Sequence, residues 1–349
     1  MARDNVNILF LTLYPGTVAS PRYRVEQFVP HLTRSGIRCS VQSALTASEY
    51  ERLSRGRAAR YHLLETRRRI AQLLRARAYD LVFVQKGLMT AYLRGMDVLL
   101  RKRARRVVFD FDDAVHLAPP HSLRGIWRAL EDREQIADVM RNASLVLAGN
   151  AWLCDEARAH ALNVALFPTV VDTERFKPAA RAADGLVAGW IGGTSTTPHL
   201  QAAACLADIP NLRLHCIGAD REQTPWKSAL HSEWRFDTEV EALQQFDIGV
   251  MPLPKTDWSR GKCALKALQY MACGIPCVAT PFGAVLEFGR HNENLLFADS
   301  PLEWREAIEH LRDPRERARI GEAGRETVLQ SYSLHTAAPR LMELLRSVL

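Results

Sequence analysis

The chain has 349 residues, of which 47% are hydrophobic. Because a single hydrophobic core seldom grows much beyond about 250 residues, this length predicts two domains. The seven cysteines are scattered, with no Cys-x-x-Cys pair, which favours free thiols in a reducing compartment. The apolar run at residues 8–13 is shorter than a signal-peptide core, and no run approaches the ~18 apolar residues of a bilayer span. We therefore expect a cytoplasmic protein, either free or peripheral on the inner face of the cell membrane.

The net charge of +7 is concentrated early in the chain, within residues 51–77. Arginines of this segment alternate with apolar residues at roughly helical spacing, among them Arg55, Arg57, Arg60, Arg67, Arg68, Arg69, Arg75 and Arg77. The pattern predicts a basic amphipathic helix. Such a helix either docks on an anionic membrane surface or buries its leucines on its own sheet and leaves its arginines in solvent. We expect no nucleic-acid partner, because no recognition module is visible and aromatic residues do not alternate with the charges.

Apolar runs of strand length alternate with amphipathic segments of helix length along the whole chain, which is typical of parallel βαβ units. In the first half the expected strands are Asn7–Leu13, Ile37–Gln42, Leu81–Gln85, Val107–Asp110, Leu145–Leu147 and Val164–Phe167. A polar run without clear periodicity follows. We expect a first Rossmann-like domain at residues 1–170 and a linker at residues 171–185.

A second series of strands and helices follows the linker. The expected strands are Leu186–Ile191, Leu212–Ile217, Trp234–Phe236, Ile248–Met251, Cys277–Ala279 and Leu295–Phe297. The expected helices are Thr197–Ala207, Val240–Phe246, Lys262–Cys273, Pro301–Leu311 and Pro314–Tyr332. Residues 186–333 therefore form a second Rossmann-like domain, and residues 334–349 form a last amphipathic helix. The expected class is α/β, with two doubly wound domains.

One short helix carries polar side chains on a single line. At ~100° per residue, Lys262, Lys266 and Gln269 share a stripe of a helix that opens at Gly261 and closes before Pro276. The helix N-terminus adds unpaired N–H donors and about half a positive charge, so this end favours phosphate. The alternative is an ordinary solvated helix face with two lysines.

A glycine turn follows the first strand of the second domain. Gly192 and Gly193 come directly after Trp190-Ile191, and Thr194 opens the next helical segment. Glycine lets the backbone approach a phosphate closely. With Lys262 and Lys266, the turn would form one wall of a diphosphate site; by itself it is simply a turn.

Acidic residues follow a strand end in the first domain. Asp110, Asp112 and Asp113 lie together there, with His116 three residues further on. The three carboxylates would hold Mg²⁺ between them, or would only cap the loop. The loop after the first strand carries Arg22 and Arg24, which would contact a phosphate or carboxylate or would remain solvated.

Five segments of the chain resemble the GT-B fold glycosyltransferases, and within them the large retaining group numbered family 4. These segments are Asn7–Arg24, Val108–His116, Ala188–Thr194, Asp247–Leu253 and Lys262–Gly283 with Asn292–Phe297. The resemblance implies two Rossmann-like domains facing a cleft, with a C-terminal helix that crosses back to the first domain. It also implies that the second domain binds a nucleoside-diphosphate sugar, that the first binds a hydroxyl acceptor, and that no metal or other cofactor is needed.

The resemblance assigns roles to the candidate residues. Donor binding would involve Gly192, Gly193, Thr194, Gln269, Gly283 and Glu287. Catalysis and acceptor recognition would involve Lys262, Lys266, Asp112, Asp113 and His116, with Arg22 and Arg24 as phosphate or acceptor contacts. Lys262 and Lys266 would supply the countercharge on the leaving diphosphate, and that phosphate would itself help to deprotonate the acceptor.

Two departures from the family pattern stand out. Many members carry two glutamates eight positions apart around this helix, where this chain has Gly261 and Gln269. The second glutamate typically accepts hydrogen bonds from the donor ribose, and Gln269 keeps an acceptor oxygen but no charge. A basic pair that many relatives carry shortly after the glycine turn is also absent.

We predict a retaining glycosyltransferase that moves a hexose-type sugar to a glycan or lipid-linked glycan, in the synthesis of a cell-surface polysaccharide or glycoconjugate. One alternative is a sugar-nucleotide epimerase or hydrolase of the same fold. The other is a non-catalytic member that binds a partner or a lipid surface, which the missing glutamates make plausible.

Overall fold

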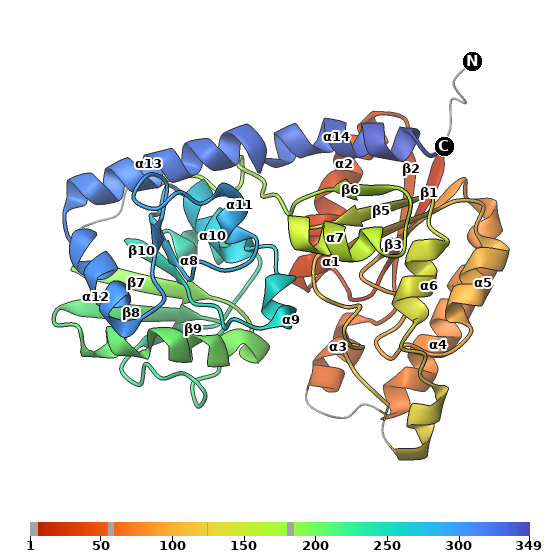
Figure 1. The fold of residues 1–349 in the computed structure, drawn as a ribbon, viewed down its shortest axis with the longest axis horizontal. Coiled ribbons are helices and arrows are strands. Elements are labelled where there is room, and N and C mark those ends of the chain that lie inside the picture. Colours follow the sequence, from red (N-terminus) through yellow and green to blue (C-terminus); the bar gives the residue numbers. More distant parts are fainter. Residues whose placement is uncertain (1–5, 55–58, 124, 180–184) are drawn as a thin grey trace. The chain divides into compact units, whose positions relative to one another are not determined.

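The computed structural model describes residues 6–54, 59–123, 125–179 and 185–349. The chain forms two compact units (Figure 1). Unit 1 comprises Met1–Thr169, Gly261–Cys263 and Ala338–Leu349, and unit 2 comprises Val170–Arg260 and Ala264–Ala337. Three residues from the middle of the second half, 261–263, thus belong to unit 1. Of the expected linker, residues 180–184 lie outside the described residues.

Unit 1 is built on a six-stranded parallel sheet in the order β2-β1-β3-β4-β5-β6. Its strands are β1 (Asn7–Thr12), β2 (Arg38–Ser43), β3 (Leu81–Gln85), β4 (Val107–Phe111), β5 (Leu145–Ala148) and β6 (Val164–Leu166). Each strand predicted for the first half is confirmed, with its ends shifted by one residue at most. The central strands β3, β4 and β5 are buried at every position, because helices cover a parallel sheet on both faces.

The helices of unit 1 connect successive parallel strands. They are α1 (Ala19–Arg24), α2 (Val29–Arg34), α3 (Ala47–Ser54), α4 (Ala59–Leu74), α5 (Met96–Arg103), α6 (Gln135–Arg141) and α7 (Ala151–Arg158). Short 3₁₀ turns lie at Glu26–Phe28, Ala76–Ala78 and Gly125–Leu130. Residues 338–349 also belong to this unit, where Arg340 donates a hydrogen bond of 2.8 Å to the carbonyl of Leu166.

The predicted basic helix over residues 51–77 is only partly correct. The segment contains the end of α3 and all of α4, and residues 55–58, with Arg55 and Arg57, lie outside the described residues. Arg69 is fully buried and donates to the carbonyls of Thr12 and Leu88. A helix packed on a sheet needs partners for the carbonyls at the strand ends, and this arginine supplies them. It therefore adds nothing to a basic surface.

Unit 2 is built on a second six-stranded parallel sheet, in the order β12-β11-β10-β7-β8-β9. Its strands are β7 (Leu186–Ile191), β8 (Leu212–Ile217), β9 (Leu230–Ser232), β10 (Ile248–Met251), β11 (Cys277–Ala279) and β12 (Leu296–Phe297). The strand predicted at Trp234–Phe236 is wrong, because Leu230–Ser232 pairs with β8 instead. The two aromatic residues make side-chain contacts: Trp234 donates to Glu239, and Arg175 stacks 4.0 Å from the ring of Phe236.

The helices of unit 2 are α8 (Glu239–Leu243), α9 (Asp257–Arg260), α10 (Leu265–Ala272), α11 (Val285–Phe288), α12 (Pro301–His310) and α13 (Pro314–Ser331). The last helix, α14 (Leu334–Arg346), begins in unit 2 and ends in unit 1. The helix expected at Thr197–Ala207 is a kinked 3₁₀ segment, η4 (Thr194–Asp208), with Pro198 inside it. Proline lacks the N–H that a regular α-helix needs, so Pro198 removes one helical hydrogen bond near the start of the segment, whereas the kink lies at Ala203, with φ of −117°.

The helix expected at Lys262–Cys273 is shorter than predicted. α10 begins at Leu265, because Ala264 adopts a left-handed conformation with φ of 51°. Lys262 therefore precedes the helix and does not share a helical stripe with Lys266 and Gln269. The predicted alignment of three polar side chains is wrong for Lys262.

The strand order predicts which edge of each sheet carries a ligand site. In unit 1 the chain passes from β1 to β2 on one side and to β3 on the other; in unit 2 β7 lies between β8 and β10. Such a change of direction leaves a crevice at the carboxyl ends of the two strands, where α/β proteins bind ligands. We therefore expect ligand sites after β1 and β3 in unit 1, and after β7 and β10 in unit 2.

Candidate active site

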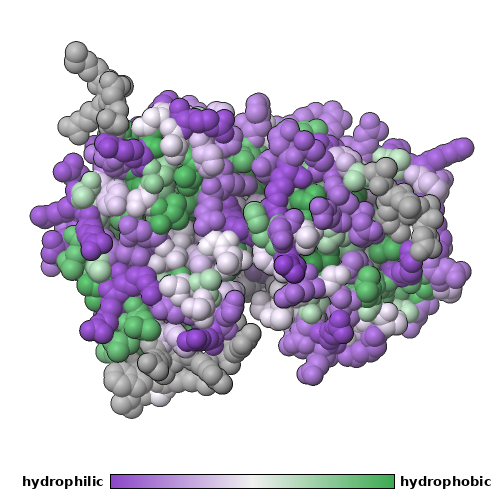
Figure 2. Space-filling view, turned by 180° about the vertical axis from the view of Figure 1, so that it is seen from behind, coloured by the Kyte–Doolittle hydropathy of each residue, from purple (hydrophilic) through white to green (hydrophobic). Residues whose placement is uncertain are grey.

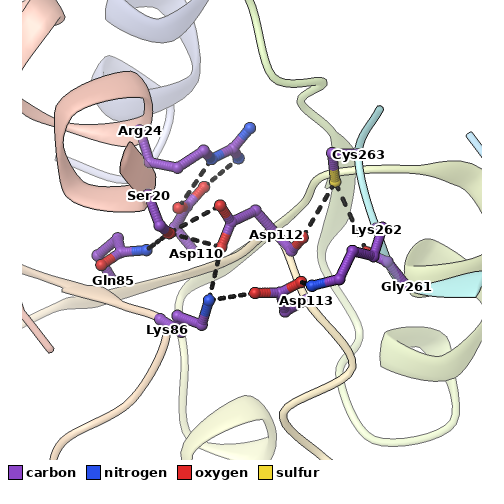
Figure 3. Close-up of polar contacts among 10 residues, drawn as sticks. All are labelled: Ser20, Arg24, Gln85, Lys86, Asp110, Asp112, Asp113, Gly261, Lys262 and Cys263. Carbon is purple, nitrogen blue, oxygen red and sulfur yellow. Dashed lines mark hydrogen bonds and ion pairs between the residues drawn. The ribbon is translucent and has the colours of Figure 1, made fainter. Parts of the chain in front are cut away.

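Asp113 of unit 1 lies between two ammonium groups (Figure 3). Lys262 donates to one of its oxygens at 2.7 Å, and Lys86, which follows β3, pairs with the other. Burial alone would raise the pKa of Asp113, but Lys262 and Lys86 outweigh it and hold the pKa well below its usual range. Asp113 is therefore ionised at neutral pH and is unsuited to accept a proton as a general base.

Asp112 joins the loops that follow three strands. The hydroxyl of Ser20, on α1 after β1, lies 2.8 and 2.7 Å from its two oxygens, and Lys86 lies 3.8 Å away. Gln85, the last residue of β3, donates to the same hydroxyl at 2.7 Å. The carboxyl ends of β1, β3 and β4 thus meet at one polar cluster, at the edge of the sheet that the strand order indicates (Figure 3).

Arg24 and Asp110 form an ion pair in which neither side chain is exposed. The guanidinium also donates to the carbonyl of Phe167 at 2.7 Å. The prediction placed Arg24 in contact with a ligand phosphate or acceptor; the structure uses it to neutralise the buried carboxylate below the cluster. Arg22 is partly exposed, with its guanidinium 5.7 Å from the ring of Tyr23, and its ligand role stays a prediction.

The segment 261–263 is fitted tightly into unit 1. The thiol of Cys263 lies 3.3 Å from the carbonyl of Asp112, and Asn150 donates to the carbonyl of Lys262 at 3.2 Å. A β-carbon at Gly261 would lie 2.6 Å from the backbone nitrogen of Ala114. No larger side chain fits there, which gives a physical reason why the first glutamate of the family pattern is absent.

Two residues beside this cluster have strained backbones. Lys86 has φ of 69° and Ala264 has φ of 51°. Such a conformation costs on the order of 1–3 kcal/mol for a residue other than glycine, and is found where the surroundings hold it in place for function. The ion pair with Asp113 holds Lys86 in this conformation.

His116 does not join the acidic residues. Its ring lies 5.4 Å from that of Trp152 and 6.4 Å from that of Phe111, and its Nε2 lies 3.5 Å from a carboxylate oxygen of Glu156. Burial lowers the pKa of His116, although Glu156 opposes the shift. These contacts place the His116 ring beside Trp152 and Glu156, and its part in catalysis or acceptor recognition stays a prediction.

In unit 2, Lys266 lies over the glycine turn (Gly192 and Gly193). A β-carbon at Gly192 would stand 2.9 Å from Cε of Lys266, and the Lys266 amine lies 5.3 Å from the ring of Trp190. Thr194 opens η4, and the hydroxyl of Thr196 donates to the carbonyl of Gly193 at 3.0 Å. The structure therefore brings together Lys266 and the glycine turn, whereas Lys262 is part of unit 1.

Gln269 is buried next to a carboxylate that the sequence did not indicate. Its amide nitrogen donates to Glu239 at 3.0 Å, and Glu239 is 2% exposed. Trp234 donates to the same carboxylate at 3.2 Å, and Arg175 pairs with it at 2.9 Å. Glu239 was missed because an acid in the first turn of a helix is ordinary in any sequence.

Gly283 and Glu287 are the two remaining residues that were predicted to bind the donor. Gly283 has φ of 70°, which favours glycine, and precedes α11. Glu287 is exposed on α11, and its contact with a sugar stays a prediction. Within the described residues no group of three or more histidine, cysteine, aspartate or glutamate side chains is arranged to hold a metal ion. Asp110 and Asp113, which the magnesium alternative required, are paired with Arg24 and with the two lysines.

Residues 198–346 match a family model described as glycosyl transferase-like. No curated protein sequence matches the chain.

Solved structures share the fold over almost the whole chain. Sucrose-phosphate synthase from Thermosynechococcus elongatus is 15% identical, with 98% of this chain and 99% of that chain covered and a TM-score of 0.73. Anabaena HepE in complex with UDP is 17% identical, with 98% and 100% covered and a TM-score of 0.68. A glycosyltransferase from Rickettsia africae is 13% identical, with 99% of both chains covered and a TM-score of 0.71.

These likenesses show the fold: two parallel α/β units of the GT-B type. The family match covers most of unit 2, including β8, β10 and the helix that carries Lys266 and Gln269. Residues 198–346 are therefore similar to the glycosyl transferase-like family, and the chain as a whole has the fold of the GT-B glycosyltransferases.

Proposed function

We propose that the chain transfers a sugar from a nucleoside diphosphate to a hydroxyl acceptor, with retention of configuration at the anomeric carbon. The observation that carries the proposal is the position of Lys266 over Gly192, after β7 at the switch point of the second sheet. A glycine turn exposes backbone N–H groups to a phosphate, and an ammonium beside it adds the countercharge. Structures with this fold have been solved with UDP and with UDP-glucose, which supports the choice of ligand.

The chemistry follows from where charge develops. As the glycosidic bond breaks, negative charge builds on the leaving diphosphate, and a preformed cation there is the largest single catalytic contribution. Lys266 provides it, and the predicted contribution of Lys262, which belongs to unit 1, stays a prediction. The leaving phosphate takes the acceptor proton on the same face of the sugar, so no separate base is needed. The ionised Asp113, held by two lysines, agrees with this scheme.

The polar cluster of unit 1 offers the acceptor site. Ser20, Asp112 and Lys86 converge at the carboxyl ends of the strands and present hydrogen-bonding groups suited to sugar hydroxyls. The acceptor class that we propose is a glycan or lipid-linked glycan. Transfer is proposed to be independent of divalent metal ions, so EDTA in the assay is expected to leave the rate unchanged.

A surface of unit 1 is suited to an anionic membrane. Leu63, Leu64 and Leu74 of α4 are exposed by 63%, 40% and 47%. The exposed Arg67 lies on the same side, since these four residues fall within about 100° around the helix. Figure 2 shows small hydrophobic patches among hydrophilic side chains on the face of the protein that it views. No helix in the described parts of the chain has the length and apolar composition to cross a bilayer. We therefore propose peripheral docking through α4.

Donor binding and turnover test the proposed function together. A thermal-shift panel of UDP, GDP, CDP and dTDP sugars identifies the donor, because a ligand that binds the folded state raises its stability. With that donor and membrane extracts as acceptor source, Lys266→Ala is expected to lower transfer by ~10²-fold or more. Lys255→Ala, which removes an exposed lysine paired with Asp299, is the matched control.

The products decide between the proposal and its rivals. Sugar on an acceptor with the donor's anomeric configuration, shown by NMR, supports the proposal. Free altered sugar nucleotide would instead indicate an epimerase or hydrolase. Donor binding without turnover would indicate a non-catalytic binding protein.

A further inference from the structure

Two charged residues on the buried side of α4 hold the loop that follows β3. Glu65 and Arg69 lie about one helical turn apart, and both are 0% exposed. Arg69 donates to the carbonyl of Leu88 at 2.6 Å and to that of Thr12, the last residue of β1, at 2.8 Å. Glu65 accepts the N–H and the hydroxyl of Thr90, each at 2.7 Å. The two side chains therefore tie the end of β1 and the loop after β3 to α4.

Packing alone does not require charged residues at these two positions. A buried ion costs free energy that an apolar side chain of similar volume does not, unless hydrogen bonds offset the cost. The third hydrogen bond of Arg69 goes to the amide oxygen of Gln72 at 2.9 Å, and His62 lies 3.5 Å from Glu65. Burial lowers the pKa of Arg69 to about 10, although Glu65 opposes the shift, so the guanidinium stays charged at neutral pH. What the two charges add is their hydrogen bonds to the loop.

The loop held in this way begins with Lys86, two residues before Leu88 and four before Thr90. Lys86 has φ of 69°, a conformation that persists in a lysine only where its surroundings hold it. Its amine points toward Asp112 and Asp113 (Figure 3). A shift of the loop would therefore move the amine away from both carboxylates.

We propose that Glu65 and Arg69 are positioning residues that hold Lys86 at the polar cluster of unit 1 and thereby set the affinity for the acceptor. The inference rests on the proposed function, in which that cluster binds the acceptor. It adds that the acceptor site is held in place from the buried side of α4, through the backbone of the loop. Lys86 offers a hydrogen-bond donor to a sugar hydroxyl beside Asp112 only while the loop keeps its position.

Replacing both residues by apolar ones removes the hold without leaving a buried charge. Glu65→Leu with Arg69→Met introduces side chains of similar size, and such replacements of buried ionic groups are often tolerated. Arg69→Lys is the milder variant, because an ammonium lacks the planar fork with which the guanidinium reaches two carbonyls. Arg75→Met, at an exposed arginine just beyond the end of α4, is the matched control.

Chemical labelling measures the position of Lys86 without any activity. Burial alone would lower the pKa of Lys86, but Asp113 and Asp112 outweigh it and raise the pKa above its usual range. Because acetic anhydride reacts only with neutral amines, Lys86 of the native protein is expected to be labelled slowly. In the double variant its labelling, measured by mass spectrometry, is expected to rise by about tenfold or more, since a pKa lower by about one unit raises the neutral fraction about tenfold. The exposed Lys255 is the internal reference.

The second measurement separates acceptor from donor. With the donor that the thermal-shift panel selects, the rate of transfer is followed against the amount of membrane extract. The amount that gives half the maximal rate is expected to rise by about tenfold or more in the double variant, while calorimetry shows native affinity for the nucleoside diphosphate. A general loss of structure would weaken both. Arg75→Met is expected to match the native protein in labelling and in transfer, and Arg69→Lys to show smaller changes in the same direction as the double variant.

The outcomes separate this inference from the proposed function. If the native protein transfers no sugar, the proposed function fails, and the acceptor role of Glu65 and Arg69 fails with it. If transfer occurs but the folded double variant has the native labelling of Lys86, or needs no more extract than the native protein, the positioning role is overturned while transfer stands. If the double variant does not fold, the same two measurements on Arg69→Lys are conclusive, and native values there overturn the inference.

Discussion

Asp113 pairs with Lys86 through one carboxylate oxygen and with Lys262 through the other. Because Lys86 can neutralise Asp113 without Lys262, two roles of Lys262 can be tested separately: neutralising Asp113 and stabilising the leaving diphosphate. If Lys262 served only to neutralise Asp113, removing both charges together would be harmless. If Lys262 also stabilises the leaving diphosphate, removing its amine costs turnover whether or not Asp113 is charged.

Lys262→Ala is expected to lower kcat by ~10²-fold or more while the protein stays folded, since Lys86 still pairs with Asp113. Steady-state kinetics and thermal unfolding measure the two effects. The double variant Lys262→Ala with Asp113→Asn is the control, and we expect it to stay slow. Recovery of the native rate in the double variant, or an unchanged rate in Lys262→Ala, would defeat the assignment to the diphosphate.

Sequence patterns predicted some site residues and missed others for a physical reason. The glycine turn and Lys266 were visible because a turn after a strand and a helix start are local signals, and the structure brings them together. Ser20, Lys86 and Glu239 were not predicted, since their partners lie on other strands or helices. No local pattern shows that Gly261 must be glycine; that follows only from its contact with Ala114.

At the scale of the elements, a bidentate ion pair between Glu49 of α3 and Arg68 of α4 joins the two helices. Arg68 donates to both oxygens of Glu49, at 2.6 and 2.9 Å, and to the carbonyl of Ala44 at 2.7 Å. The hydrogen bonds from Arg68 lower the pKa of Glu49 to about 2, although burial opposes the shift. Arg68, one arginine of the expected basic helix, is therefore paired with Glu49 and not left to solvent.

The depressed pKa predicts how stability depends on pH. Because the folded-state pKa lies below the unfolded value of 4.5, the contribution of Glu49 is complete above about pH 4.5 and is lost as the pH falls towards 2. Glu49→Gln is expected to lower Tm at pH 6 and to show a smaller fall in Tm between pH 5 and pH 2.5 than the native protein. Glu51→Gln, on the same helix and exposed, is the control. Parallel Tm curves for the native protein and Glu49→Gln would contradict the assignment.

Strands were predicted better than helix ends, and the burial of the sheets explains it. A parallel strand covered on both faces is a continuous apolar run, such as Leu81–Gln85 or Val107–Phe111, that stands out in a sequence. β9 is an edge strand whose residues are partly exposed, so the sequence pattern favours the more apolar Trp234–Phe236 instead. The predicted start of α10 is wrong because no sequence pattern indicates that Ala264 adopts a left-handed conformation.

At the scale of the whole molecule, the exposed leucines of α4 give the proposed membrane docking a direct test. Flotation with vesicles of equal parts phosphatidylglycerol and phosphatidylcholine is expected to carry the native protein, and pure phosphatidylcholine to carry less. Leu63→Ser with Leu74→Ser should reduce flotation by about tenfold, since each buried leucine contributes on the order of 1.5–3 kcal/mol of transfer free energy. Leu302→Ser, at an exposed leucine of unit 2, is the control. Equal flotation of all variants would refute docking through α4.

The α/β class and two doubly wound sheets were predictable because the alternation of apolar and amphipathic segments runs through the entire chain. The membership of residues 261–263 in unit 1 was not, because composition and periodicity do not change at that point.

This placement of residues 261–263 has a consequence for how the protein is made. A polypeptide released after Thr169 would contain Asp113 and Lys86 but neither the second lysine nor the thiol that fills the space beside Gly149. During synthesis, the lysine that completes the charge cluster of the first sheet is therefore added nearly a hundred residues after Thr169. Residues 1–169 expressed alone are expected to be unstable.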